Sequence, residues 1–174
     1  MLNVIKGEKV SLRPITLKDT DLIIKWRNNP DVITSFVYQK PLTKSEHVKW
    51  MKTKVLSGEA VQYIIMTNTD NIPIGSVYFR DIDNENRSAE YGIFIGNKYY
   101  FSKGYGSETA KLFLDFGFNV LHFHRIFLRV FSDNERAIKS YLNAGFLKEG
   151  IAKDMIFQNG KYRSMLFMSK IARG

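Results

Sequence analysis

Residues 88–146 read SAEYGIFIGNKYYFSKGYGSETAKLFLDFGFNVLHFHRIFLRVFSDNERAIKSYLNAGF, and the patterns in this stretch decide the fold. They follow one another as an alternating β-rich run, a glycine turn, an amphipathic helix, a second β-rich run and a capped helix, at 88–95, 103–107, 108–121, 125–130 and 134–144. The helix between the two β-rich runs is long enough to cross back over a sheet, so we expect these runs to be parallel neighbours. The stretch therefore predicts a βαβα unit.

The residues before this unit predict a strand, two helices and a hairpin. We expect the strand within 4–15, and a helix that begins at Thr16 and Asp19, which form a capping-box pattern, and ends before Pro30. Residues 31–42 should form a loop, and a second capping box begins the next helix. This second capping box is formed by Thr43 and Glu46, and the helix that it begins should end at Gly58. Hairpin strands are expected at 61–67 and 72–81.

The residues after the unit predict one more hairpin, because Asn159-Gly160 is typical of a type I′ turn. The complete order is then βααβββαβαββ. This order describes an α/β (α+β) fold with a mixed sheet of six to seven strands.

The composition indicates one globular unit. The 174 residues are 44% hydrophobic and 14% aromatic, and no Pro/Gly/Ser-rich linker divides them, so we expect a single domain over residues 1–174. The chain has no cysteine, which excludes disulfides and thiol catalysis. We find neither an apolar run near the ~20 residues of a membrane span nor a signal-like leader, which predicts a cytoplasmic protein without a membrane partner.

The net charge favours an anionic partner. Lys and Arg number 26 against 17 Asp and Glu, which gives +9, and nucleic acid, a polyphosphate cofactor or an acidic membrane surface would each suit this charge. A nucleic-acid-binding module would need base-stacking aromatic residues on an open sheet among clustered Lys and Arg. The basic residues are instead dispersed, and Phe113 and Phe118 fall at core spacing. We therefore favour an enzyme over a nucleic-acid-binding module.

The glycine turn Lys103-Gly104-Tyr105-Gly106-Ser107 is a candidate phosphate site. Backbone N–H groups at a helix start are unpaired and carry partial positive charge, and glycine leaves the backbone open to a ligand. A GxG pattern alone also marks ordinary turns. Neither a P-loop lysine nor a dinucleotide-binding fingerprint accompanies it.

The segments FSKGYGSETA (101–110) and LHFHRIFLRVFSDNERAIKSYLNAGF (121–146) resemble the acetyl-CoA-binding core of the GNAT N-acetyltransferases. The resemblance implies two central parallel strands that splay apart, with the pantetheine arm of acetyl-CoA entering the gap. It also implies that residues 103–107 bind the pyrophosphate. Phe101 stands where the family often has Gln or Arg, so the expected cradle is formed by backbone groups. The residues implied to pair with the pantetheine through their backbone are Phe94, Ile95 and Gly96.

Tyr141 and Glu90 are the candidate catalytic residues. Acetyl transfer needs a neutral amine and a proton for the departing thiolate. The resemblance places Tyr141 opposite the thioester sulphur as the acid, although its spacing also fits the apolar face of its helix. Glu90 lies on the strand beside the gap. Three roles are open for it: the base itself, the carboxylate that holds a water acting as base, or an ordinary surface carboxylate. Asn134 is expected to cap its helix and to bond the cofactor arm.

The sequence leaves several partners open. Lys103, Arg136 and Lys139 are candidates for the 3′-phosphate of CoA, and Arg27, Asn28 and Tyr38 for the acceptor. The favoured acceptor is a small-molecule amine, specifically a nucleotide-linked amino sugar, because WRNNPDV, SEHVKW and IPIGSVYFRDID resemble that branch. The alternative is the N-terminus of a protein such as a ribosomal protein. We expect a monomer or homodimer, and no metal, because His122 and His124 lack a third ligand at suitable spacing.

Overall fold

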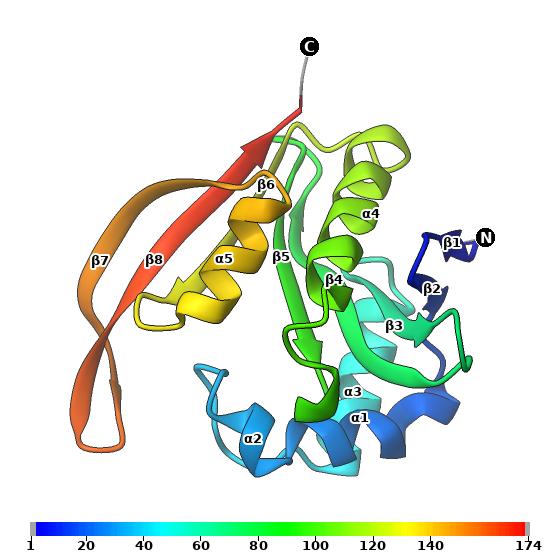
Figure 1. Ribbon diagram of the computed structural model, residues 1–174, viewed down its shortest axis with the longest axis horizontal. Helices are drawn as coiled ribbons and strands as arrows, with labels where there is room; N and C mark the ends of the chain where they lie inside the picture. The colour runs from blue at the N-terminus through cyan, green and yellow to red at the C-terminus, as the bar shows by residue number, and fades with distance from the viewer. Residues whose placement is uncertain (1–2, 173–174) are drawn as a thin grey trace.

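The computed structural model describes residues 3–172 and shows one mixed sheet with helices on both faces (Figure 1). The eight strands lie in the order β1-β2-β3-β4-β5-β6-β8-β7. Their bounds are β1 Ile5–Lys6, β2 Val10–Pro14, β3 Val61–Thr67, β4 Pro73–Asp83, β5 Ser88–Ile95, β6 Arg125–Phe131, β7 Leu147–Gln158 and β8 Lys161–Ile171.

Five α-helices and three short helical turns connect these strands. The helices are α1 Thr20–Arg27, α2 Pro30–Ile33, α3 Lys44–Trp50, α4 Tyr105–Asn119 and α5 Glu135–Asn143. Two 3-10 turns lie at Leu17–Asp19 and Lys98–Tyr100, and a π-helical turn at Met51–Val55 continues α3. No helix within residues 3–172 is long and apolar enough to cross a membrane.

Strands β5 and β6 are parallel neighbours, as the sequence predicts, and they separate after a few residues. Their pairing covers Ser88–Glu90 against Arg125–Phe127 and goes no further. Figure 1 shows the two strands diverging below this point. Beyond Glu90, β5 remains paired with β4 on one side only. The predicted mixed sheet with splayed central strands is confirmed.

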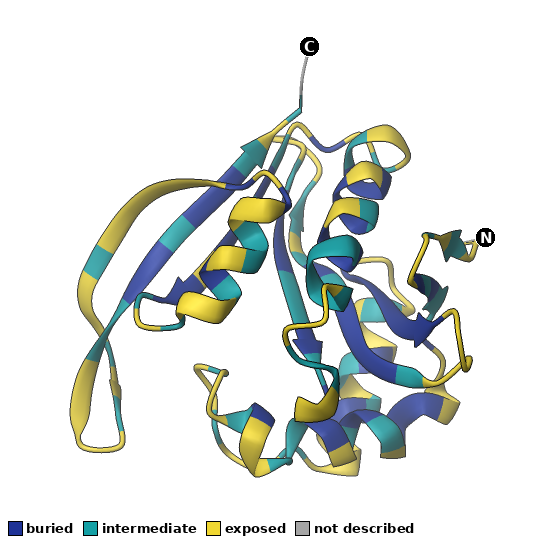
Figure 2. Ribbon diagram, in the orientation of Figure 1, coloured by how far each residue is buried: buried dark blue, intermediate teal, exposed yellow. Residues whose placement is uncertain are grey.

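The two faces of the sheet carry separate cores. On the α4 side, Phe113 of α4 stacks on Phe79 of β4, with ring centroids 4.2 Å apart, and Ile126 and Tyr91 belong to the same core. On the α1 side, Trp26 packs edge-on against Phe94 of β5. Figure 2 shows the buried residues concentrated in the central strands between these helices. Alternation along β5 therefore sends neighbouring side chains to different cores.

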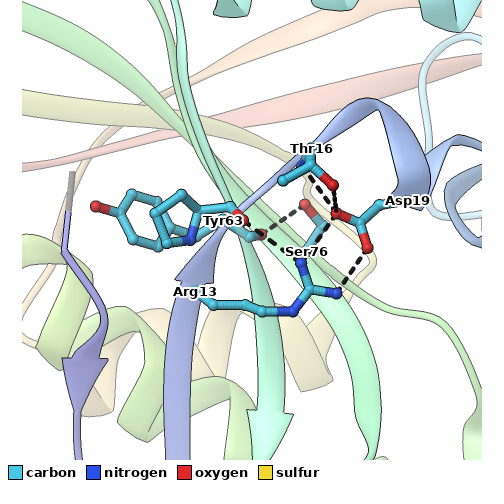
Figure 3. A network of polar contacts seen from close by, with 6 residues as sticks. Arg13, Thr16, Asp19, Tyr63 and Ser76 are labelled. Atoms are coloured by element: carbon cyan, nitrogen blue, oxygen red, sulfur yellow. Dashed lines mark hydrogen bonds and ion pairs between the residues drawn. The ribbon is translucent and has the colours of Figure 1, made fainter. Parts of the chain in front are cut away.

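A polar network fixes the start of α1 to the sheet (Figure 3). Arg13 of β2 donates two hydrogen bonds to the carboxylate of Asp19, with N···O distances of 2.9 and 2.6 Å. The Thr16 amide donates to the same carboxylate at 2.8 Å, and this closes the predicted capping box. Beside it, Ser76 Oγ donates to the carbonyl of Tyr63. The direction in which α1 leaves the sheet is thus fixed by a bidentate ion pair.

Two predicted segments differ in detail. The expected strand within 4–15 is broken at Gly7, whose amide donates to the Val10 carbonyl, so β1 and β2 form a small hairpin and the sheet has eight strands. The expected loop at 31–42 begins with helix α2, because Pro30 occupies the first turn, where no N–H is needed. Asn29 caps α2 by accepting from the Asp31 amide.

The β7–β8 hairpin reaches over to the segment after α2. Its turn has positive φ at Asn159 and Gly160, 54° and 77°, as a type I′ turn requires. Gln158 Nε2 donates to the carbonyls of Phe36 and Val37, at 3.3 and 2.8 Å. The hairpin therefore supports the loop that borders the opening between β5 and β6.

Candidate active site

A cavity of about 690 Å³ lies where β5 and β6 diverge. This volume is within the range of small-molecule sites. Strands β4, β5 and β6, the start of α4, helix α5 and the segment after α2 all contribute to its wall. The predicted site residues that line it are Arg27, Tyr38, Glu90, Phe94, Ile95, Gly104, Gly106, Ser107, Asn134, Arg136 and Tyr141.

The glycine turn presents three small residues to this cavity. Gly104 has φ +88° and occupies the N-cap of the 15-residue α4, and Gly106 and Ser107 follow in its first turn. A Cβ at Gly104 would have only the flexible Lys9 amine within 4 Å, so no other described side chain packs against this backbone. Unpaired amides of a helix start form an anion site. The residues present therefore fit a diphosphate without side-chain help.

Two predicted members of this cradle lie outside the cavity wall. The Lys103 ammonium sits 3.5 Å from the centroid of the Tyr99 ring, as a cation–π pair. Tyr105 packs edge-on against Tyr100, with centroids 6.0 Å apart. Only the small residues of the turn reach the cavity.

Arg136 is the predicted basic residue best placed for an anion. Its guanidinium carbon lies 3.7 Å from the centroid of Phe101, and both residues line the cavity together with Lys139. Burial lowers the pKa of Arg136, and no carboxylate within residues 3–172 pairs with it. Asn134 Oδ1 accepts from the Ala137 amide at 3.2 Å, so it caps α5, as expected, and lines the cavity as well.

The free edge of β5 supplies backbone groups toward the gap. Phe94 and Ile95 line the cavity beyond the end of the β5–β6 pairing. Gly96 does not line it: its amide donates to the Ile74 carbonyl at 2.7 Å, and its carbonyl accepts from Asn29. The available strand edge is therefore shorter than the sequence predicts.

Tyr141 enters the cavity from α5. Its ring packs edge-on against Tyr91 and Phe146, with centroid distances of 6.1 and 5.8 Å. Burial raises the pKa of Tyr141, and the nearby Tyr78 phenol raises it further. The hydroxyl therefore keeps its proton at neutral pH and has a proton to donate.

Glu90 is buried between two arginines that the sequence analysis did not identify. Arg129 donates to both carboxylate oxygens, at 2.9 and 3.0 Å, and Arg80 donates to one of them at 3.0 Å. Burial alone would raise the pKa of Glu90, but the hydrogen bonds from Arg129 and Arg80 outweigh it and lower the pKa. Such a carboxylate stays ionised and is a weak proton acceptor. The geometry favours an electrostatic and positioning role over that of a direct base.

The Glu90→Gln variant tests this ion-pair cluster. Removing one partner of a fully buried pair costs about 3–5 kcal/mol. Because Arg80 and Arg129 remain 39% and 36% exposed, we expect a smaller loss of unfolding free energy, about 1–2 kcal/mol. The lowered pKa stabilises the fold above the unfolded value of ~4.3, and this contribution disappears as pH falls through the folded pKa. Melting curves of both proteins should therefore converge in acid.

A suitable control is Glu59→Gln, because Glu59 forms an exposed pair with Lys54. It should leave the melting temperature unchanged. If Glu90→Gln lowers the melting temperature no more than the Glu59→Gln control at every pH, the cluster does not stabilise the protein.

Arg27 has no charged partner among the described residues. Its guanidinium carbon lies 3.7 Å from the centroid of Phe36 and 6.0 Å from that of Phe94, on the cavity wall. Its Nε is buried without a hydrogen-bond partner among residues 3–172, and burial lowers its pKa. Tyr38 lines the same wall and is exposed. Asn28 does not reach it, because its amide bonds both backbone groups of Leu42.

The α1 side of the cavity contains three residues that the sequence analysis missed: Tyr78, Arg80 and Arg129. In each case, alternation gave a usable signal. Tyr78 and Arg80 are two apart on one strand, and Arg129 interrupts an apolar run. The structure describes no cluster of three or more metal-ligating side chains within residues 3–172.

The family model described as "Acetyltransferase (GNAT) domain" matches residues 9–147. The chain is 30% identical over 171 residues to the uncharacterized N-acetyltransferase p20 of Bacillus licheniformis, covering 95% of this chain and 94% of that one. It is 30% identical to spermidine N(1)-acetyltransferase of Escherichia coli K12, covering 93% and 86%.

Among solved structures, spermidine N-acetyltransferase from Vibrio cholerae in complex with CoA and spermine superposes with a TM-score of 0.86. That likeness covers 95% of this chain and 96% of the other at 24% identity, so it concerns the fold. The family match over most of the chain, with a glycine cradle and splayed strands in the expected places, confirms the resemblance seen in the sequence. The chain belongs to the GNAT acetyltransferase family, and the protein is an acetyl-CoA-dependent N-acetyltransferase.

Proposed function

We propose that the protein acetylates the primary amine of a small molecule that also carries an anionic group, such as a nucleotide-linked amino sugar. The observation that carries this proposal is Arg27, an unpaired guanidinium held on an aromatic wall of the cavity. Arg27 is half-buried, and a partly desolvated charge without a partner is costly. A bidentate phosphate or carboxylate offsets that cost. The acceptor's anionic group is the natural partner.

The remaining charges on the α1 side support an anionic acceptor. Arg80 and Arg129 share the carboxylate of Glu90, and Arg80 also lies 3.8 Å from the exposed carboxylate of Asp81, which is not in the cavity lining. On this side the lining itself has three positive groups, Arg27 included, and one negative group. Like charges placed together at a binding site cost several kcal/mol. For a polyamine, which is polycationic at pH 7, Glu90 is the one carboxylate of the described cavity lining that could offset this cost.

The site residues divide the reaction between the two faces of the sheet. The first turn of α4 holds the diphosphate, and the free edge of β5 orients the arm behind it. When bound, acetyl-CoA supplies the acetyl thioester. The amine attacks the thioester carbonyl carbon from the α1 side, the C–N bond forms and the C–S bond breaks. Tyr141 donates its proton to the departing sulphur, and the proton that the nitrogen loses restores the Tyr141 hydroxyl.

A polyamine acceptor is the second candidate. It is favoured by one finding, the 30% identity to a spermidine N(1)-acetyltransferase over most of both chains. A free-thiol release assay separates the candidates. The acceptor panel contains nucleotide-linked amino sugars, spermidine and N-terminal peptides of ribosomal proteins. We expect the highest kcat/KM for an amine that carries a phosphate, and a preference for spermidine would overturn the proposal.

The Arg27→Met variant is the matched test of the anion contact. Hydrogen bonds to a charged group contribute about 1.5–3 kcal/mol, so we expect KM for the anionic acceptor to rise about tenfold to hundredfold. KM for acetyl-CoA should not change. Arg87→Met removes the same charge from an exposed turn and serves as the control. An unchanged acceptor KM in Arg27→Met would remove this residue from acceptor binding.

A further inference from the structure

Tyr78 reaches across β5 to the edge that β6 leaves free. It lies opposite Gly92 in the β4–β5 register, two residues past the last β5–β6 pair at Glu90. A Cβ at Gly92 would collide with Cζ, Cε2 and Oη of Tyr78. The hydroxyl end of the phenol ring therefore lies over Gly92. Only glycine allows this close approach.

The Tyr78 hydroxyl is open to the cavity and unused. Tyr78 lines the cavity, and its Oη makes no hydrogen bond with any residue within 3–172. The Arg80 guanidinium carbon lies 6.0 Å from the Tyr78 ring centroid.

Tyr141 approaches the same edge from the other face. Its ring packs against Tyr91, the residue that precedes Gly92 and points to the α4 side. The two tyrosines thus flank one short piece of the β5 edge, Tyr78 on the acceptor side and Tyr141 on the thioester side. Glu90, the one carboxylate of the described cavity lining, is already bound by two arginines and has a lowered pKa. Glu90 is therefore a poor acceptor for the proton that the attacking amine loses.

We propose that Tyr78 is a catalytic residue that receives the proton of the attacking amine and passes its own proton to Tyr141. The amine nitrogen forms the new C–N bond and gives one proton to Tyr78 Oη. The two hydroxyls are not hydrogen-bonded to each other, so the Tyr78 proton moves to Tyr141 Oη through one bridging water, and the Tyr141 proton moves to the sulphur as the C–S bond breaks. One proton has passed from nitrogen to sulphur, and both tyrosines end neutral. No separate base is needed for this step.

This inference rests on the proposed function only in that an amine attacks from the α1 side. The test therefore uses hydroxylamine as the common probe, alongside spermidine and a nucleotide-linked amino sugar, and records the ratio of variant to wild-type kcat for each. Because every amine must lose a proton, the ratio should be the same for all that are acetylated. A preference for spermidine over the nucleotide-linked amino sugar would overturn the anionic-acceptor proposal. The ratio of Tyr78→Phe to wild-type kcat would not be affected by that result.

Tyr78→Phe keeps the ring on Gly92 and removes only the hydroxyl. We expect kcat to fall about 10²-fold with hydroxylamine, with the dissociation constant of acetyl-CoA unchanged. Tyr162→Phe, on the exposed face of β8 and outside the cavity wall, is the control and should retain full activity. Wild-type kcat in Tyr78→Phe would overturn the proposal.

The double variant Tyr78→Phe/Tyr141→Phe distinguishes a relay from two separate roles. Residues that act as one unit are strongly non-additive, so the double variant should be no slower than the slower single variant. Two independent contributions would instead multiply, and that result would refute a relay between Tyr78 and Tyr141. Melting temperatures of all variants, which should stay near that of wild type, exclude loss of the fold as the cause.

Discussion

Replacing Gly104 by valine is expected to abolish acetyl-CoA binding in a protein that still folds. Gly104 has φ +88° at the N-cap of α4 and lines the cavity. A residue with a Cβ in the left-handed region costs about 1–2 kcal/mol, which is a fraction of the 5–15 kcal/mol stability of a typical protein. The branched side chain would occupy the space through which a phosphate approaches the amides. Isothermal titration with acetyl-CoA should show no heat of binding.

The matched control is Gly58→Val. Gly58 has φ +83°, and a Cβ there would meet no atom within 4 Å, so this variant carries the same backbone strain far from the cavity. We expect both variants to lose similar thermal stability and only Gly104→Val to lose the shift in melting temperature that acetyl-CoA produces. Undiminished affinity in Gly104→Val would place the diphosphate elsewhere.

Tyr141→Phe is expected to lower kcat by about 10²- to 10⁴-fold, the usual contribution of a positioned acid. The ring contacts with Tyr91 and Phe146 remain in this variant, so acetyl-CoA affinity and thermal stability should stay close to wild type. Burial raises the pKa of Tyr141, so the wild-type hydroxyl remains protonated well above neutral pH. If activity falls as the pH is raised from neutral to ~10, deprotonation of Tyr141 should not be the cause.

Stopped-flow measurement of a single turnover checks this prediction, because it isolates the chemical step from product release. Tyr141→Leu is the comparison, since it removes both the hydroxyl and the aromatic contacts and should also lower stability. Equal single-turnover rates in wild type and Tyr141→Phe would assign the proton to another donor.

The features predicted from sequence are those that local chemistry determines. The caps at Thr43 and Asn134 and the turn at Asn159-Gly160 all formed, because each depends on groups within three or four residues. The parallel strands followed from the length of the helix between them. Helix α2 was missed because Pro30 both ends one helix and begins another, and the sequence signal for the second is a single asparagine cap.

The active site was predictable only in part because its polar groups come from different strands. Arg129 meets Glu90 across 39 residues, and the pairing follows from the register of β5 with β6. Tyr78 needed the β4–β5 register and a glycine opposite it. For Lys103 the sequence predicted a contact that the structure does not show. The residue was expected beside the phosphate, but its ammonium instead packs on the ring of Tyr99. Such side-chain choices depend on tertiary neighbours that spacing does not reveal.

The early parting of β5 from β6 also bears on how the protein avoids aggregation. An unpaired strand edge at the rim of a sheet is a template for pairing with other molecules. Here the free edge lies in the middle of the sheet, and Gly104 at the N-cap of α4 and Tyr141 of α5 belong to the cavity wall beside it. The fold therefore leaves the main-chain donors and acceptors of this edge accessible to a narrow ligand, and it prevents the strand of another molecule from pairing with them.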